Sequence, residues 1–289
     1  MKFGVCIPNF GNNANKLTID KVAESAERFE YDSIWTTDHI IVPKKERTYV
    51  NTYESISTLA YLSAKTENIL LGTSIIVLPL RDPIILAKEI ATIDNLSEGR
   101  VILGIGVGWL REEFVFLKKD FQNRGKIADE YIKTMKEIWM KEEIEYKINN
   151  ETVNFVSLPK PIKIPKILIG GNSKRAIKRA AKIGDGWFPV GMHYDDIRKG
   201  REILNKLSPY SKPIFLRILV NVGGRKIMYK GTTGELRVSL GGSDSEIIND
   251  LEKYKKSGVI HVACWFGEVN IEEFIERMRK FKEIMNVFR

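Results

Sequence analysis

The stretch from Leu103 to Phe114 reads LGIGVGWLREEF, and the fold depends on what this stretch is. Three glycines alternate with aliphatic residues, as in a dinucleotide-binding loop, a plain strand end or a phosphate-binding turn of another kind. A G-x-G-x-x-G fingerprint that begins at Gly104 requires a glycine where Trp109 stands. The dinucleotide-loop interpretation therefore fails, and the neighbouring segments have to decide between the other two.

Short apolar runs alternate with amphipathic segments along the chain. Eight runs have the length and composition of buried strands, and each is followed by a segment with helical periodicity. The runs span residues 2–8, 33–38, 69–78, 101–106, 165–171, 186–190, 213–222 and 259–266. This order predicts an α/β protein with a (β/α)8 TIM barrel, in one domain over residues 1–289. A doubly wound open sheet is the alternative, but it needs no count of eight and favours a phosphate fingerprint after the first strand.

Several local signals refine this barrel. INNETV at 148–153 lies between two β-like runs and predicts a small hairpin inserted before the fifth strand. The segment 223–242 is rich in glycine and predicts an extended loop after the seventh strand. Asp82–Pro83 predicts a helix start, and Ser243-x-x-Glu246 and Asn270-x-x-Glu273 predict capping boxes.

Composition excludes several classes of protein. The net charge is +9, but the 46 basic residues are scattered among 37 acidic ones without a basic–aromatic ladder, so no nucleic-acid partner is expected. An acidic small-molecule ligand is compatible with the charge. No segment approaches the roughly 18 apolar residues of a membrane span, and the N-terminus lacks a signal-peptide pattern, so a cytoplasmic protein without a membrane partner is expected. No metal site is expected from two cysteines, Cys6 and Cys264, and three histidines that lie far apart. Barrel closure makes the first and eighth strands neighbours, but inert buried thiols are expected and not a disulfide.

The chemistry of a TIM barrel gathers at the carboxyl ends of its strands. The residues at these ends that could form a site are Asp38 and His39 after strand two, Thr73, Ser74 and Ile75 in strand three, Gly106, Val107, Gly108 and Trp109 after strand four, and Gly170, Gly171, Asn172 and Ser173 after strand five.

Two of these strand ends are glycine corners, here defined as residues 106–109 and 170–173. The second corner precedes a helix, whose free N–H groups and dipole favour an anion, so together they predict one phosphate site. The alternative is that the glycines only turn the chain. His39 can shuttle protons or be a packed ring held by a backbone carbonyl, and Trp35 and Trp187 are expected in the core.

These strand ends carry a family resemblance. SIWTTDH (33–39), LGTSIIVLPLRDPIILAKEIATIDNLSEGRVILGIGVGW (71–109), FQNRGKIADEYI (121–132), PKILIGGNS (165–173) and GDGWFP (184–189) resemble the bacterial luciferase-like oxidoreductase superfamily. The likeness is greatest to its branch of probable oxidoreductases that depend on coenzyme F420, a deazaflavin. It covers residues 1–190 and weakens thereafter.

The resemblance implies a barrel with a flavin or deazaflavin at the carboxyl ends of its strands. Thr73, Ser74 and Ile75 match the bulge under the cofactor ring, where relatives often have a non-proline cis peptide, here expected at Ser74–Ile75. The two glycine corners match the phosphate contacts. Asp38 and His39 match the catalytic pair beside the ring. Several deazaflavin dehydrogenases carry a glutamate where this chain has Gly108–Trp109, which leaves His39 as the candidate for proton transfer.

The function expected from this resemblance is hydride transfer between coenzyme F420 and a small organic substrate. A luciferase-like monooxygenase that uses FMN and dioxygen is the alternative, and a non-catalytic cofactor-binding member is a second one. A homodimer is expected, as is common for such barrels. Loops 9–17, 40–52 and 223–242 are expected to line the substrate pocket.

Overall fold

The computed structural model describes residues 1–148 and 151–289 and contains a closed barrel of eight parallel strands. In order around the barrel these are β1 (Lys2–Cys6), β2 (Ser33–Thr36), β3 (Leu70–Thr73), β5 (Val101–Gly106), β8 (Lys166–Gly170), β9 (Gly186–Phe188), β10 (Ile214–Val222) and β13 (Val259–Trp265). Pairing of β13 with β1 and of β9 with β10 closes the cylinder. The predicted TIM barrel is confirmed, and the open sheet is wrong.

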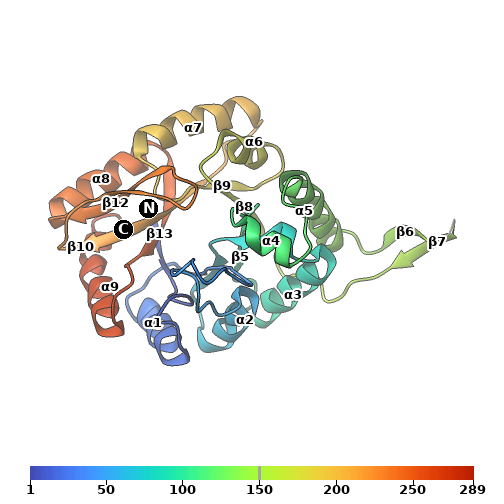
Figure 1. The fold of residues 1–289 in the computed structure, drawn as a ribbon, viewed down its shortest axis with the longest axis horizontal. Helices are drawn as coiled ribbons and strands as arrows, with labels where there is room; N and C mark the ends of the chain where they lie inside the picture. Colours follow the sequence, from blue (N-terminus) through green and yellow to red (C-terminus); the bar gives the residue numbers. More distant parts are fainter. Residues whose placement is uncertain (149–150) are drawn as a thin grey trace.

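Helices surround the barrel as an outer layer (Figure 1). They are α1 (Lys16–Arg28), α2 (Ser55–Lys65), α3 (Pro83–Leu96), α5 (Arg124–Met140), α6 (Lys174–Lys182), α7 (Tyr194–Leu207), α8 (Asp244–Lys256) and α9 (Ile271–Asn286). Asp82 caps α3 and Ser243 opens α8 with a full capping box, as predicted. Asn270 caps α9 alone, because the Glu273 carboxylate binds Arg277 instead of returning to the cap.

The interior of the barrel is packed around Trp35. Its indole donates a hydrogen bond to Ser33 Oγ at 2.6 Å and contacts the rings of Phe188 and Phe215. Strand β3 passes close to the indole at Gly72, where an added Cβ would lie 2.2 Å from Trp35 Cε3. The interrupting glycine that marks an irregular strand in the sequence therefore also makes room for the central side chain.

Two segments differ from the prediction. Residues 223–242 are not an extended loop, since β11 (Met228–Lys230) and β12 (Leu236–Gly242) form a ribbon in which β12 pairs with β10. The alternation that buries Val238 and Leu240 was obscured by the surrounding glycines. A short helix after β5, α4 (Arg111–Phe116), was not predicted.

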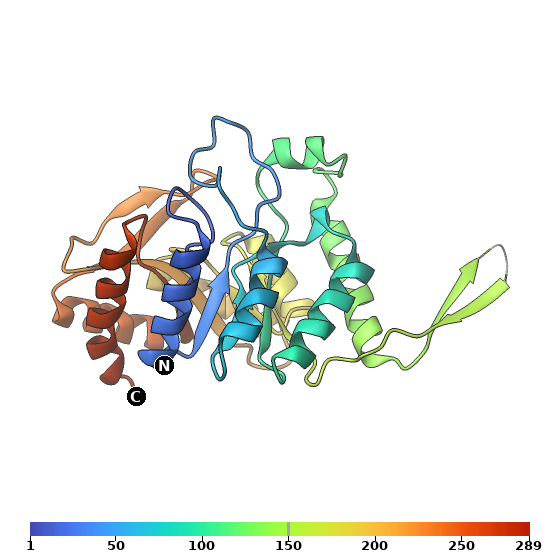
Figure 2. The ribbon, with the colours of Figure 1, turned by 90° about the horizontal axis from the view of Figure 1, so that it is seen from below.

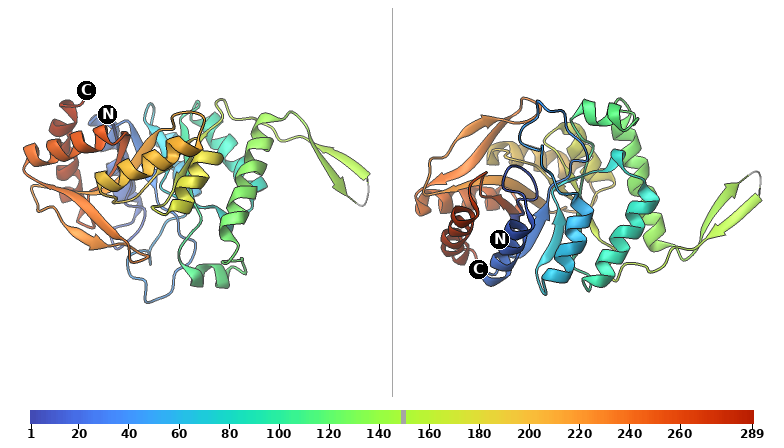
Figure 3. Two further views of the ribbon diagram at one scale, coloured as in Figure 1. Left: turned by 90° about the horizontal axis from the view of Figure 1, so that it is seen from above. Right: turned by 60° about the horizontal axis from the view of Figure 1, so that its bottom comes forward.

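The predicted hairpin before the fifth barrel strand is present as β6 (Ile144–Ile148) and β7 (Glu151–Phe155), and it projects away from the barrel (Figures 1 and 2). The turn residues 149–150 lie outside the described residues. In Figures 2 and 3 the loop after β2 and helix α4 rise from one end of the barrel, and both termini lie toward the other. This raised end carries the carboxyl ends of the strands.

Two smaller findings concern the cysteines and the length of the helices. Cys6 and Cys264 are both free and buried, and they point to opposite sides of the barrel wall, Cys6 inward and Cys264 toward the helices. Neighbouring strands therefore do not bring the two thiols face to face. Within the described residues, no helix has the length and apolar character needed to cross a membrane.

Candidate active site

Strand three breaks at the predicted bulge. The Ser74–Ile75 peptide is cis, as expected, and separates β3 from the short β4 (Ile76–Val77) and a 3-10 turn, η1 (Leu78–Leu80). The bulge is tied on three sides. Thr73 Oγ1 donates to Gly104 O at 2.8 Å, Ser74 N donates to Thr36 O at 2.7 Å, and Arg217 donates to Ser74 O at 2.5 Å.

The two glycine corners lie side by side against this bulge. Strands β5 and β8 pair in register up to Ile105 and Ile169, so Gly106 and Gly170 follow on neighbouring strands. An added Cβ would lie 1.9 Å from Ile75 Cδ1 at Gly106, and 2.7 Å from Ile75 Cγ2 at Gly170. The side chain of Ile75 thus fills the space that both glycines leave, which joins three predicted site segments into one surface.

Beyond these contacts both corners turn with left-handed backbone. Gly108 has φ of +78° and Gly171 has φ of +115°, a conformation that favours glycine. Asn172 exchanges two hydrogen bonds with the backbone of Val190, at 2.8 and 2.9 Å, which fixes the second corner against the segment that follows β9. Ser173 then caps α6 by accepting from Ala176 N. Val107 and Trp109 are half-buried at the first corner.

Two arginines stand near these corners. Arg124, at the start of α5, donates from Nε to Gly108 O at 3.2 Å and lies over the Phe121 ring at 3.9 Å. Partial burial lowers the pKa of Arg124, and the like charge of Arg175 lowers it further. The hydrogen bond from Arg124 to Gly108 places a positive charge at the first glycine corner, which favours an anion there. FQNRG carried the family resemblance, but nothing in the sequence alone singled out Arg124.

Asp38 is buried at the end of β2. Its carboxylate accepts from Val77 N at 2.9 Å and from Arg81 Nη2 at 2.5 Å, while the same Arg81 nitrogen binds Glu54 at 2.7 Å. Burial raises the pKa of Asp38, despite the neighbouring guanidinium. Asp38 therefore fastens β2 to the segment after the bulge, and both of its oxygens already have partners.

His39 is paired with a carboxylate that the sequence analysis missed. Its Nδ1 lies 3.2 Å from Glu113 Oε2, and both side chains are almost wholly buried, at 5% and 1% exposure. Glu113 Oε1 also accepts from Ile40 N at 2.6 Å and Ile41 N at 3.2 Å. Helix α4 brings Glu113 to the turn after β2, 74 residues away in sequence.

Aromatic rings surround this pair. Tyr49 lies 4.3 Å from the His39 ring centroid, and Trp109 meets His39 edge-on at 5.9 Å. Because Trp109 belongs to the first glycine corner, the His39–Glu113 pair and the corner form one continuous site. A signal for Glu113 existed in LREEF, where an acidic pair directly follows the corner. Only the fold separates Glu113 from the exposed Glu112, which binds Lys45.

Comparison with known proteins identifies the family. The sequence profile of the luciferase-like monooxygenase family matches residues 1–208. The chain belongs to the luciferase-like monooxygenase family. It is 30% identical over 198 residues to an uncharacterized protein of Mycobacterium tuberculosis, an alignment that covers 62% of this chain and 70% of that protein. It is also 30% identical over 150 residues to an FMNH2-dependent dimethylsulfone monooxygenase of Pseudomonas fluorescens, which covers 50% of this chain and 41% of that protein.

Solved structures agree with the fold. An F420-dependent secondary alcohol dehydrogenase aligns with a TM-score of 0.81 at 17% identity, over 100% of this chain and 99% of that one. The proteins similar to this chain in sequence thus include ones named for F420 and for FMNH2. The comparisons place this chain among flavin- or deazaflavin-dependent oxidoreductases.

Proposed function

We propose that this protein transfers a hydride between coenzyme F420 and a small organic substrate, and that His39 exchanges the accompanying proton. The observation that carries this proposal is the buried His39–Glu113 pair, which adjoins Trp109 of the first glycine corner. When bound, the deazaflavin supplies a carbon that accepts or donates a hydride. The chain has to position the ring, exclude water and handle one proton.

The residues present suit such a cofactor. Gly106 and Gly170 leave room for the Ile75 side chain, so the bulge on which a flat ring would rest lies directly beside both corners. The hydroxyl of Thr37, two residues before His39, is buried without a partner among the described residues, and a bound polar group would relieve the cost of that isolation. The glycine corners, the start of α6 and Arg124 suit the phosphate. We assign the cofactor contacts to these segments on that basis.

Glu113 determines how His39 can act. An ionised carboxylate only accepts hydrogen bonds, so Nδ1 of a neutral His39 must carry the proton that points to Glu113. The other nitrogen, Nε2, then has a lone pair available to take a proton from a substrate hydroxyl. The reverse reaction returns that proton. We assign His39 as the catalytic residue, and Asp38 and Glu113 as residues that position it.

The FMN-dependent monooxygenase is the competing function, and the relative from Pseudomonas fluorescens supports it. The glycine corners serve the phosphate of either cofactor. The F420 assignment rests on the His39–Glu113 pair, since oxidation or reduction of a carbon–oxygen bond by hydride transfer moves one proton per turnover. A homodimer with its substrate pocket under the loops of the raised barrel end completes the proposal, and sedimentation velocity tests the assembly.

The decisive experiment titrates the purified protein with F420 and with FMN by fluorescence, then follows anaerobic turnover with a panel of alcohols and carbonyl compounds. We expect tighter binding of F420, and turnover that falls about 10²- to 10⁴-fold in His39→Ala with the F420 dissociation constant retained. If the protein bound FMN but not F420, and consumed oxygen, the monooxygenase function would replace the one proposed. Full turnover in the variant would remove His39 from catalysis, and tight binding without any turnover would support a non-catalytic role.

A further inference from the structure

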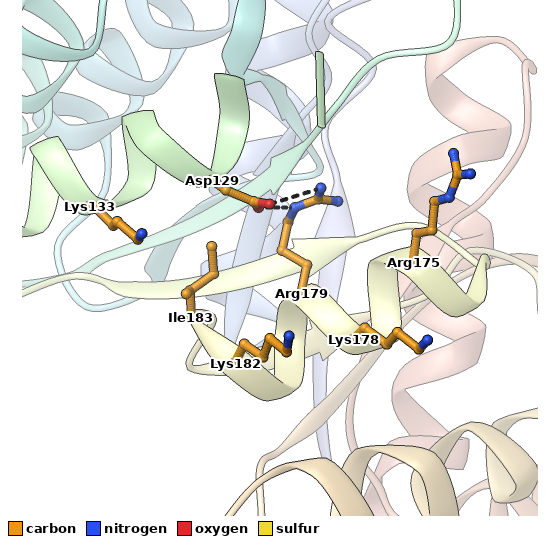
Figure 4. Close-up of a pocket in the computed structure, with 7 residues that line it drawn as sticks. All are labelled: Asp129, Lys133, Arg175, Lys178, Arg179, Lys182 and Ile183. Atoms are coloured by element: carbon orange, nitrogen blue, oxygen red, sulfur yellow. Dashed lines mark hydrogen bonds and ion pairs between the residues drawn. The ribbon is translucent and has the colours of Figure 1, made fainter. Parts of the chain in front are cut away.

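A basic groove runs between helices α5 and α6 on the outside of the barrel (Figure 4). This α5–α6 groove has a volume of about 350 Å³. Asp129 and Lys133 line it from α5, and Arg175, Lys178, Arg179 and Lys182 line it from α6. It does not belong to the site described above, although it begins next to it.

The groove holds more positive charge than its own carboxylate can balance. Five cations face one acidic residue, and Asp129 is already bound by Arg179. Within the described part of the chain, no other carboxylate lies within 4.0 Å of the charged nitrogens of Lys133, Lys178 or Lys182. Arg175, Lys178 and Lys182 follow at intervals of three and four residues, which places them along one face of α6. Such a row can bind successive negative charges of an extended ligand.

The groove starts at the second glycine corner. Arg175 comes two residues after Ser173, the cap of α6. Its charge lowers the pKa of Arg124, which donates to Gly108 O in the first corner. Because α6 runs from this corner along the outside of the barrel, a ligand whose phosphate sat between the corners would have the groove as a charged exit. Each further cation then lies about one helical turn beyond the last.

We propose that the α5–α6 groove binds the oligoglutamate tail of coenzyme F420, an inference that rests on the proposed function. The tail begins beyond the cofactor's phosphate and carries one carboxylate for each glutamate, so its charges recur along an extended chain. Lys133, Lys178 and Lys182 bind these carboxylates. FMN ends at its phosphate and leaves the groove without a ligand, so the same cations also discriminate between the two cofactors.

The test compares two natural forms of the cofactor, one with a long oligoglutamate tail and one that ends before the first glutamate. Dissociation constants are measured by fluorescence for the wild-type protein and for the triple variant K133Q/K178Q/K182Q. Exposed ion pairs change a binding constant by about twofold each, so the variant should bind the long-tailed form about eightfold more weakly. Binding of the tailless form should not change, and added salt should erase the difference between the forms.

The matched control is K206Q/K256Q/K280Q, which removes the same charge from exposed lysines on α7, α8 and α9. It should bind both forms as the wild type does. Equal affinity of the wild type for both forms refutes the tail site while the proposed function stands. An equal loss in the control refutes it too, because net charge would then explain the effect. Failure to bind either form refutes the proposed function and the tail site with it.

Discussion

Replacing Glu113 with glutamine tests whether this side chain sets the protonation of His39. The glutamine has the shape of the carboxylate, and its oxygen can keep the hydrogen bonds from Ile40 N and Ile41 N, which both end on Oε1. Its amide nitrogen takes the place of Oε2, 3.2 Å from His39 Nδ1. An amide nitrogen donates, so Nδ1 has to become an acceptor and the ring proton moves to Nε2.

The expected magnitudes follow from these contacts. Two backbone hydrogen bonds lose their charge assistance, worth about 1 kcal/mol each, so the free energy of unfolding should fall by about 2 kcal/mol. This lowers Tm by about 3 °C for a chain of this size. With its lone pair moved to Nδ1, His39 can no longer accept a substrate proton at Nε2. Turnover in the direction of substrate oxidation should then fall by about 10²- to 10⁴-fold.

Nitrogen-15 NMR of the imidazoles measures the change directly and needs no substrate. The chain has three histidines, so a His39→Gln variant assigns the signals. At alkaline pH the wild type should show a protonated Nδ1 on His39, and Glu113→Gln a protonated Nε2. The matched control is Glu112→Gln, which replaces an exposed carboxylate that binds Lys45 and should alter neither signal nor Tm. An unchanged His39 tautomer in Glu113→Gln would refute the positioning role, whatever the turnover.

Three further substitutions test separate parts of the structure. Gly106→Ala puts a methyl group 1.9 Å from Ile75 Cδ1 and should lower stability by about 1–3 kcal/mol in urea unfolding, and Ile75→Val, which lacks that atom, should restore most of it. If the double variant is no better than the single one, the clash is not the cause. Burial lowers the pKa of His261 to about 3, so as the pH falls below about 6.5 this imidazole takes up a proton only in the unfolded state. The free energy of unfolding should therefore decrease by about 2 kcal/mol by pH 5. His261→Gln should remove that part of the slope, and an identical slope in both proteins would contradict the assignment. Thr37→Val removes the unpartnered hydroxyl and should leave Tm of the cofactor-free protein equal or higher while cofactor affinity falls; unchanged affinity would show that no cofactor atom binds there.

The barrel could be predicted because each strand and helix carries its own pattern. Apolar strands alternate with amphipathic helices, and caps such as Asp82 and Ser243 mark the helix starts. Residues 223–242 escaped the prediction because glycines flank the short alternation that contains Val238 and Leu240. This alternation is too short to indicate a strand in a segment that contains six glycines. The strand becomes evident only from its pairing with β10.

The glycine corners and Asp38–His39 could be located because strand ends gather at one rim of a barrel. Glu113 and Arg124 could not, because their importance depends on contacts with distant residues. Glu113 lies in a helix too short to show periodicity, and nothing local separates it from Glu112. Arg124 resembles any first-turn arginine until α5 is placed beside Gly108. Pairing across space, and not residue type, is the information that the sequence lacked.

Several deazaflavin dehydrogenases carry a glutamate where this chain has Gly108–Trp109, and this difference illustrates a limit of comparing motifs position by position. A motif records which residue occupies a position along a strand, whereas proton transfer depends on which atoms meet. Here α4 returns a carboxylate to His39 five residues after Gly108, so the strand end is free to turn with left-handed backbone. A glutamate at position 108 would place a Cβ 2.6 Å from Val77 Cγ1 in that backbone conformation. Supplying the carboxylate from the following helix thus allows a glycine at position 108 together with a buried acid–histidine pair.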